Sequence, residues 1–541
     1  MRIAARLTNA CLLAVGVLLI SVEGGVADDS GIENEWDEIG RLSARIDAHI
    51  EDHYERNNIT PAARSDDAEF FRRVSLDLSG KIPHASEAID FLENTDPDKR
   101  RKAVDRLLES PGYVTHFTTF WRNAMLPEVN ADYQIRFLVP GFEAWLRQQL
   151  TENRPYDELV QEILTTELET PRGEPDNRLE RFGEASPLAF YQAKQIAPEN
   201  LAAASSRIFL GIRIECAQCH DHPFDDWKRD EFWQFAAFFA GIERDRNRGI
   251  YGEVRELFDR REINVPDTER VVQAGYLDGT QPQWQFRIGP RETLANWITA
   301  SENPYFARAT VNRLWGHFFG VGLVDPLDDF SAANPPSHPD LLDLLAREFT
   351  AHDFDLKFLI RAVTASDAYQ LSSEKSDDSQ DDPRLFARMA VRGLTPEQVF
   401  DSVAQAIGYH EPYRANRSRS IDRGGPRGEF LEAFGNDADF LTERQTTILQ
   451  ALMMMNGGFV TRGTDPSDSR TLAAIVEFPR LSTDERIERM YFAVLSRPPR
   501  AEELQRLVRY VEEGGANNDP RQAYSDIFWA LLNSSEFLFN H

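Results

Sequence analysis

The chain is poor in cysteine, because its 541 residues include only Cys11, Cys216 and Cys219. A framework of disulfide bonds is therefore excluded, and a chain of this length buries enough apolar surface without one. Internal repeats of about 20 to 50 residues and heptad runs are also missing, which argues against solenoids and coiled coils. The sequence has neither a G-x-S-x-G elbow nor a phosphate-binding glycine loop, so it gives no support to a serine hydrolase or a nucleotide-binding enzyme.

Positive charge is scarce as well. Lysine and arginine number 60 against 89 aspartates and glutamates, which gives a formal net charge of −29. Such a surface repels phosphate backbones and anionic lipid headgroups, so we expect no nucleic-acid partner and no electrostatic docking to membranes. Hydrophobic residues make up 41% of the chain, which is typical of a globular protein rather than a disordered one.

The N-terminus has the pattern of an export signal. Arg2 and Arg6 precede the short apolar run Cys11–Ile20, and the small residues Gly25–Ala27 then offer a cleavage site. This pattern predicts a signal peptide over residues 1–27 and a periplasmic or extracellular protein. No later stretch is apolar enough to span a membrane, so we expect no integral membrane segment after cleavage. Removal of the signal would leave Cys216 and Cys219 as the cysteines of the mature chain.

Apolar residues recur at helical spacing through most of the remaining sequence. The periodicity predicts helices over 34–56, several over 68–126 and 135–164, and one from Pro198 to about Ile214. Val311, Leu314, Trp315 and Phe318 share one face of another predicted helix, over 305–319.

The segment 243–290 differs from its surroundings. Ile263–Pro266 and Trp284–Phe286 alternate in polarity, and Asp278-Gly279 is a turn pair, so a few short strands are expected. We therefore predict a mainly α protein with two helical domains joined by a segment with a few short β-strands. The predicted boundaries are 28–245 for the first domain, 246–290 for the connecting segment and 291–541 for the second domain.

The feature that suggests chemistry is a C-x-x-C-H motif, Cys216-Ala217-Gln218-Cys219-His220. In c-type cytochromes this spacing lets two thiols add to the vinyl groups of one haem while the histidine binds the iron. The motif predicts covalent haem c, with thioethers from Cys216 and Cys219 and with His220 as the proximal iron ligand. The sixth ligand is not readable, because His222 is too close to His220 to reach the opposite face of one haem, and His317 and His338 fit structural histidines better than ligands.

Other interpretations of the motif remain open. Cys216 and Cys219 can form a disulfide or a redox pair in an oxidising compartment. Cys216, Cys219, His220 and His222 can instead provide a site for zinc or another transition metal, although zinc sites usually draw their ligands from separate segments. A purely structural role, without any cofactor, is the remaining alternative.

Two further clusters have a structural and a functional interpretation. An aromatic-rich helix is expected just after the motif, with Asp225 or Asp226 as its cap, either as ordinary core or as a wall against a flat ligand. The acidic cluster before the Pro-rich loop fits turn chemistry better than a metal or acid–base site. The aromatic residues are Phe224, Trp227, Phe232, Trp233, Phe235, Phe238 and Phe239, and the acidic residues are Asp325, Asp328 and Asp329.

Several long motifs resemble one known family combination. Residues 205–239, which contain the C-A-Q-C-H string, resemble the signature of DUF1549 (PSCyt2), the planctomycete cytochrome-c-associated family, and residues 70–83 resemble its opening. Residues 303–338, 352–373 and 534–541 resemble its usual partner domain, DUF1553 (PSD1). The resemblance implies a link to cytochrome c at Cys216, Cys219 and His220.

We therefore expect an exported haem-c protein that acts in electron transfer or in a haem-dependent redox reaction. A single haem would need an external redox partner protein. One alternative is a metal-dependent periplasmic hydrolase that uses His220, His222 and nearby aspartates, with polysaccharide as the candidate substrate. The other alternative is a non-catalytic binding or scaffold protein. The sequence assigns no catalytic residue.

Overall fold

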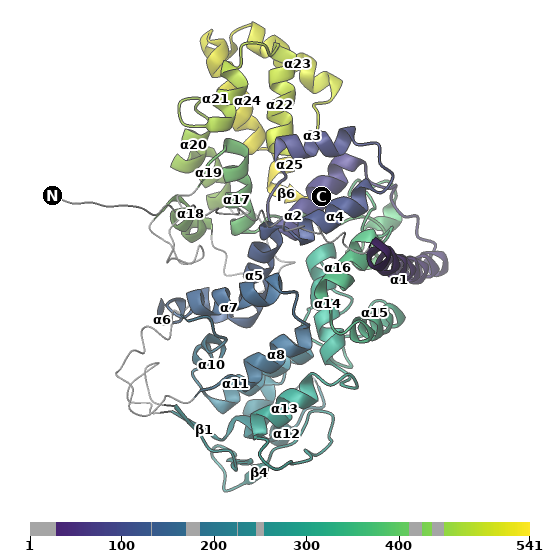
Figure 1. The fold of residues 1–541 in the computed structure, drawn as a ribbon, viewed down its shortest axis with the longest axis vertical. Helices are drawn as coiled ribbons and strands as arrows, with labels where there is room; N and C mark the ends of the chain where they lie inside the picture. Colours follow the sequence, from purple (N-terminus) through teal and green to yellow (C-terminus); the bar gives the residue numbers. More distant parts are fainter. Residues whose placement is uncertain are drawn as a thin grey trace, which may run out of the picture.

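The computed structural model describes residues 29–130, 133–168, 184–223, 225–244, 254–410, 425–434 and 448–541. These residues form helices throughout, and their strands pair as antiparallel two-stranded sheets (Figure 1). The predicted fold class, mainly α with a few short strands, is confirmed. The predicted signal peptide lies outside the described residues. In the described part of the chain, no helix combines the length and the apolar character needed to cross a membrane.

The first helices follow the predicted periodicity, and local residues set their ends. The side chain of Asp66 accepts a hydrogen bond from the Glu69 N–H at the start of α2, and Gly80 ends that helix with φ of 69°. The helix predicted over 34–56 is α1, which begins earlier than expected. The elements are α1 (Asp29–Asn57), α2 (Asp67–Ser79), α3 (Ala85–Glu93), α4 (Lys99–Leu108), α5 (Pro111–Met125), α6 (Tyr133–Arg136), α7 (Val139–Thr151) and α8 (Tyr156–Thr165).

Two sequence predictions near the C-x-x-C-H motif are wrong in detail. The helix predicted to reach Ile214 is α11 (Pro198–Ser205) followed by a π-helical turn over Ser206–Leu210, and it ends at Gly211, whose φ of 70° breaks the helix. The aromatic helix α12 (Arg229–Ala236) begins after Lys228 rather than after Asp225 or Asp226. Glu231 accepts a hydrogen bond from the Lys228 N–H at this end. The short helix α10 (Ala189–Ala193) precedes α11.

Two small hairpins lie between the helical parts, in the region where the sequence predicts a few short strands, and the stretch predicted from Ile263 overlaps one of their strands. Strand β1 (Ile242–Arg244) pairs with β2 (Val254–Glu256), and β3 (Glu262–Asn264) pairs with β4 (Val271–Gln273). Gly279 has φ of 79° in the predicted turn. Trp284–Phe286 does not form a strand; Trp284 instead packs beside Phe238 of the helical core.

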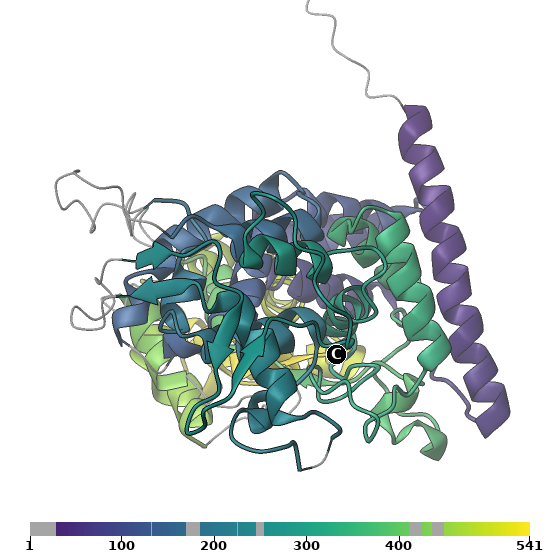
Figure 2. The same ribbon diagram turned by 90° about the horizontal axis from the view of Figure 1, so that it is seen from below.

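The helices of the second half follow these hairpins in sequence. Helix α14 carries the apolar face predicted for 305–319, and its Leu314, Trp315 and Phe318 are at most 1% exposed. Helix α1 lies along α15 and α16 at one edge of the molecule (Figure 2), where Arg361 of α16 bonds Glu35 of α1 at 3.1 Å. The elements are α13 (Pro290–Ile298), α14 (Phe306–Phe319), α15 (Pro339–Ala351), α16 (Leu356–Ala365), β5 (Arg392–Gly393), α17 (Pro396–Ile407), α18 (Pro426–Phe434), α19 (Ile448–Asn456), α20 (Gly458–Gly463), α21 (Arg470–Glu477), α22 (Thr483–Leu495), α23 (Ala501–Glu512), α24 (Pro520–Leu532), α25 (Ser535–Leu538) and β6 (Phe539–Asn540).

The buried apolar side chains form two clusters that do not follow the order of the sequence. The larger cluster runs from Ile39 to Met389 and includes Phe492, so helices on both sides of the hairpins share one core. The smaller cluster runs from Leu394 to Phe537, and Leu76 of α2 and Ile82 join it from the start of the chain. Helix α2 therefore packs into both cores. The domain boundaries drawn from the sequence stay a prediction.

Buried charged groups of α2 tie it to the end of the described chain. Asp77 is 1% exposed, and it accepts hydrogen bonds from Tyr369 Oη at 2.8 Å, Arg392 Nη2 at 2.9 Å and Asn540 Nδ2 at 2.7 Å. Arg72, also 1% exposed, donates to the carbonyl oxygens of Val494, Glu536 and Phe537.

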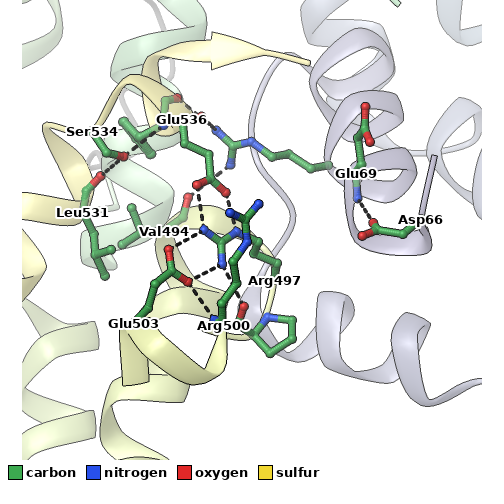
Figure 3. Close-up of polar contacts among 12 residues, drawn as sticks. Asp66, Glu69, Val494, Arg497, Arg500, Glu503, Leu531, Ser534 and Glu536 are labelled. Atoms are coloured by element: carbon green, nitrogen blue, oxygen red, sulfur yellow. Dashed lines mark hydrogen bonds and ion pairs between the residues drawn. The ribbon is translucent and has the colours of Figure 1, made fainter. Parts of the chain in front are cut away.

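An ion-pair network lies opposite α2 in the same region. Arg497 lies between the carboxylates of Glu503 and Glu536, and Figure 3 shows these residues across from Asp66 and Glu69.

Candidate functional site

The C-x-x-C-H motif lies in a short exposed turn. A 3₁₀ helix spans Glu215–Gln218, and Cys216, Cys219 and His220 are all exposed. Ala217, between the two cysteines, is 0% exposed and fixes the turn to the core. The two cysteines are free thiols. The fold thus buries Ala217 and leaves the side chains of Cys216, Cys219 and His220 at the surface.

Helix α12 holds this turn in place. Trp233 Nε1 donates to the carbonyl oxygen of Gln218 at 3.0 Å, and Arg229 Nε donates to the same oxygen at 3.3 Å. The Arg229 N–H donates to Asp221 Oδ1 at 3.0 Å, and this hydrogen bond, with the charge of Lys228, lowers the pKa of Asp221. The aromatic helix therefore acts as a rigid support behind the motif, and three of its aromatic side chains are buried: Phe232, Trp233 and Phe235.

His220 is oriented by its own backbone segment. Its Nδ1 lies 2.7 Å from the carbonyl oxygen of Asp221. A protonated Nδ1 donates this hydrogen bond and leaves the lone pair of Nε2 available to a metal, which is the usual arrangement of metal-ligating histidines. The N–H of His222 donates to the carbonyl oxygen of Trp227 at 2.8 Å, which closes the loop after the motif.

A charged cluster flanks the motif on its N-terminal side. Arg213 Nε bonds Asp328 Oδ1 at 2.9 Å, and Arg207 lies 3.9 Å from both Asp328 and Glu215. Burial raises the pKa of Glu215, the residue before Cys216. The structure thus gives Asp328 an ion-pairing role, which agrees with the structural interpretation of the acidic cluster.

His317 and His338, which the sequence favours as structural histidines rather than as sixth ligands, have partners of their own. His317 Nε2 lies 2.9 Å from the carbonyl oxygen of Asp77, and its ring packs against His116 and Phe120. His338 is 5% exposed, and its ring lies 4.2 Å from that of His53, tilted by 42°. These contacts of His317 and His338 are with residues outside the motif, so they place neither histidine as a sixth ligand.

The alternative metal site is not preformed. Across the described ranges, no group of three or more His, Cys, Asp or Glu side chains is arranged to hold a metal ion. Cys216, Cys219, His220 and His222 are close in sequence, but the turn does not bring their donor atoms together as a metal site.

The residues of the motif fit covalent haem c in two respects. Both thiols are free and exposed, so they are accessible to vinyl groups. The indole N–H of Trp227 is buried without a hydrogen-bond acceptor in the described structure, and a carboxylate-bearing group beside the motif would satisfy it. Phe224, also predicted to be near a flat ligand, lies outside the described residues. Cys216, Cys219 and His220 are all exposed, so a haem attached to them would lie at the molecular surface.

Sequence reasoning missed a second polar region, the cavity between α2 and the C-terminal helices. It has a volume of about 380 Å³ and contains Arg72, Arg497 and Arg500. Charged residues inside an apolar pattern, as in Phe-Phe-Arg-Arg over 70–73, are the signal in the sequence that points to such a region.

Comparisons with known proteins place two domains on the chain. The family model PSCyt2, described as "Protein of unknown function (DUF1549)", matches residues 45–244. The family model PSD1, described as "Protein of unknown function (DUF1553)", matches residues 290–423 and 421–511. No curated protein and no solved structure matches the chain.

Proposed function

The chain belongs to the family that joins a DUF1549 (PSCyt2) domain to a DUF1553 (PSD1) domain, and we propose that it is an exported haem-c protein. It would serve electron transfer or a haem-dependent redox reaction, together with a redox partner protein. The observation that carries the proposal is the turn at Cys216–His220, where two free thiols and an oriented imidazole share one exposed segment.

The residues of the turn would have distinct roles. Cys216 and Cys219 would form the thioether bonds, and His220 would bind the iron through Nε2 while the Asp221 carbonyl oxygen keeps Nδ1 protonated. A bound haem supplies one-electron redox chemistry at a potential that depends on its ligands and its exposure. Trp233 and Arg229 keep the spacing of the turn fixed through the Gln218 carbonyl oxygen.

Electron exchange with another protein fits the position of the turn. A redox centre at the surface is reachable by a partner without opening the fold, and Asp221 and Asp226 lie exposed beside the motif. With a net charge of −29 on the whole chain, the expected partner presents a positive surface. The association rate should then fall as ionic strength rises.

The test is the absorption spectrum of the chain expressed with a haem-c maturation system and then denatured. We expect a pyridine haemochrome band that stays with the polypeptide after acid–acetone extraction. The double variant Cys216→Ser/Cys219→Ser should lose this band, whereas either single variant should retain haem on one thioether. The absence of covalent haem in the wild-type chain, with the maturation system active on a control cytochrome, would refute the proposal.

A matched histidine pair tests the iron ligand. His220→Met should change the iron spectrum while both thioethers persist, because the thiols are untouched. His352 is a partly exposed histidine that stacks on Phe358 of α16, so His352→Met should leave the spectrum unchanged. Identical spectra for both variants would contradict the role of His220.

A further inference from the structure

The cavity between α2 and the C-terminal helices has the position and size of a small-molecule site. Its volume of about 380 Å³ lies within the range of roughly 300–1,000 Å³ found for ligand pockets, which often lie where two domains meet. One wall comes from the start of α2, within the DUF1549 match, and the opposite wall comes from residues 495–541. Figure 3 shows the polar residues of both walls.

The carboxylates around this cavity are already engaged. Glu69 accepts from Arg73 Nη2 at 2.7 Å and from the Ser373 N–H at 2.7 Å. Glu536 accepts from Arg497 Nε at 2.6 Å and Nη2 at 2.8 Å. Burial alone would raise the pKa of Glu536, but the hydrogen bonds and charge of Arg497 hold it below its usual range.

Two guanidinium groups of the lining, those of Arg72 and Arg500, form no ion pair with a carboxylate in the described part of the chain. Arg72 bonds only carbonyl oxygens, and its Nε is buried without an acceptor. Burial lowers the pKa of Arg72 to about 10, so the group still carries its charge at neutral pH. Arg500 is exposed, and among the described residues its guanidinium makes no ion pair. The polar groups of the cavity that remain available to a ligand are therefore mostly hydrogen-bond donors, and the Ser535 hydroxyl is one more.

The rest of the lining limits the charge and shape of a ligand. Ala68, Leu495 and Phe539 present apolar surface, and Val391, 50% exposed, lies at the edge. The negative charges of Asp66, Glu69 and Glu536 offset the positive charges of the three arginines in the lining. A doubly charged phosphate is therefore disfavoured relative to a ligand with a single negative charge. Burial lowers the pKa of His541, which favours the neutral ring, so His541 adds no further cation to Arg72, Arg497 and Arg500.

We propose that this cavity binds a small monoanionic carboxylate with an apolar body. The carboxylate lies between Arg72 and Arg500, and the apolar body packs on Leu495 and Phe539. The site is independent of the Cys216–His220 turn, so its failure leaves the haem proposal untouched. A ligand there contacts residues of both domain matches and stabilises their junction.

The test is isothermal titration calorimetry of the full chain with benzoate and with benzamide, its neutral isostere. We expect benzoate to bind at least tenfold more tightly than benzamide, because the charge-assisted hydrogen bonds are lost with the amide. Equal affinity of the two probes, or no binding of benzoate, overturns the proposal. Inorganic sulfate or phosphate binding as tightly as benzoate also overturns it, because the apolar body would then contribute nothing.

A matched arginine pair locates the site. Arg500→Gln keeps the N–H that bonds Glu503 and should weaken benzoate binding about five- to tenfold. Arg509→Gln removes an exposed arginine nine residues further along α23, about 13 Å away, and should change nothing. Ser535→Trp, at an exposed position, should fill the cavity and abolish binding. Equal affinities of the two arginine variants would contradict the location, and circular dichroism checks that each variant is folded.

Discussion

Replacing Asp77 by alanine removes the carboxylate that joins α2 to β5, β6 and the turn after α16, and we expect this to lower the free energy of unfolding by about 3–5 kcal/mol. The magnitude follows from what remains after the change. Arg392, Tyr369 and Asn540 all donate to Asp77, and their donors would be left buried or half-buried without an acceptor. Each buried donor without an acceptor costs about 1–3 kcal/mol. Water can reach the partly exposed Arg392 and would reduce the cost for that residue.

Urea unfolding, followed by far-UV circular dichroism and by tryptophan fluorescence, measures this effect. Asp77→Asn keeps an acceptor and should lose less than Asp77→Ala. Asp367→Ala is the surface control, because Asp367 is 70% exposed and lies 4.0 Å from Arg64, and it should change stability by less than about 0.5 kcal/mol. A loss below about 1 kcal/mol for Asp77→Ala would refute the reasoning that this carboxylate holds the two cores together.

Three more outcomes follow from other residues. Gly80→Ala should destabilise the protein by about 2 kcal/mol or more in thermal melts, because φ is 69° and the new Cβ would lie 2.5 Å from His116 Nδ1. In the control Gly40→Ala, in α1, the new Cβ meets nothing within 4 Å, so this variant should be neutral or stabilising. Burial, with the nearby His53 and Arg384, lowers the pKa of His338 to about 4. Between about pH 6.5 and pH 4 the unfolded state therefore binds more protons than the folded state, and the free energy of unfolding should fall as the pH drops through this range. His338→Gln should reduce this pH dependence in urea titrations. Cys216 and Cys219 should react rapidly with a thiol reagent in haem-free, reduced protein, whereas slow or absent reaction would contradict their exposure.

The helical architecture was predictable because it rests on local patterns. The apolar face of α14 and the capping and termination residues of helices are set by neighbours three or four positions apart. The strands around Ile263 were also predicted, since alternation and turn residues are local signals. The cap expected at Asp225 or Asp226 failed because the chain continues for two more residues before α12 begins.

The polar interior of the molecule was not predictable from such patterns. Arg72, Arg73 and Asp77 occupy an amphipathic helix, where charged residues are normally expected on the solvent face. Apart from Glu69, which lies four residues from Arg73, their hydrogen-bond partners lie 292 to 468 residues away in sequence. Only the tertiary fold brings these groups together. The motif at Cys216–His220 was visible in the sequence, but its exposure and the support from Trp233 required the structure.

The placement of α2 also bears on how the chain acquires its fold. This helix precedes most of the protein in sequence, yet Arg72 and Arg73 find their acceptors at Val494, Phe537 and His541, up to 468 residues later. Contacts of such separation form late, because the closure of long loops must come before the contacts can stabilise them. During synthesis, the two guanidinium groups therefore stay in water until these acceptors have been made. Docking of the last described residues on α2 then completes the smaller core, to which Leu76 and Phe537 both belong.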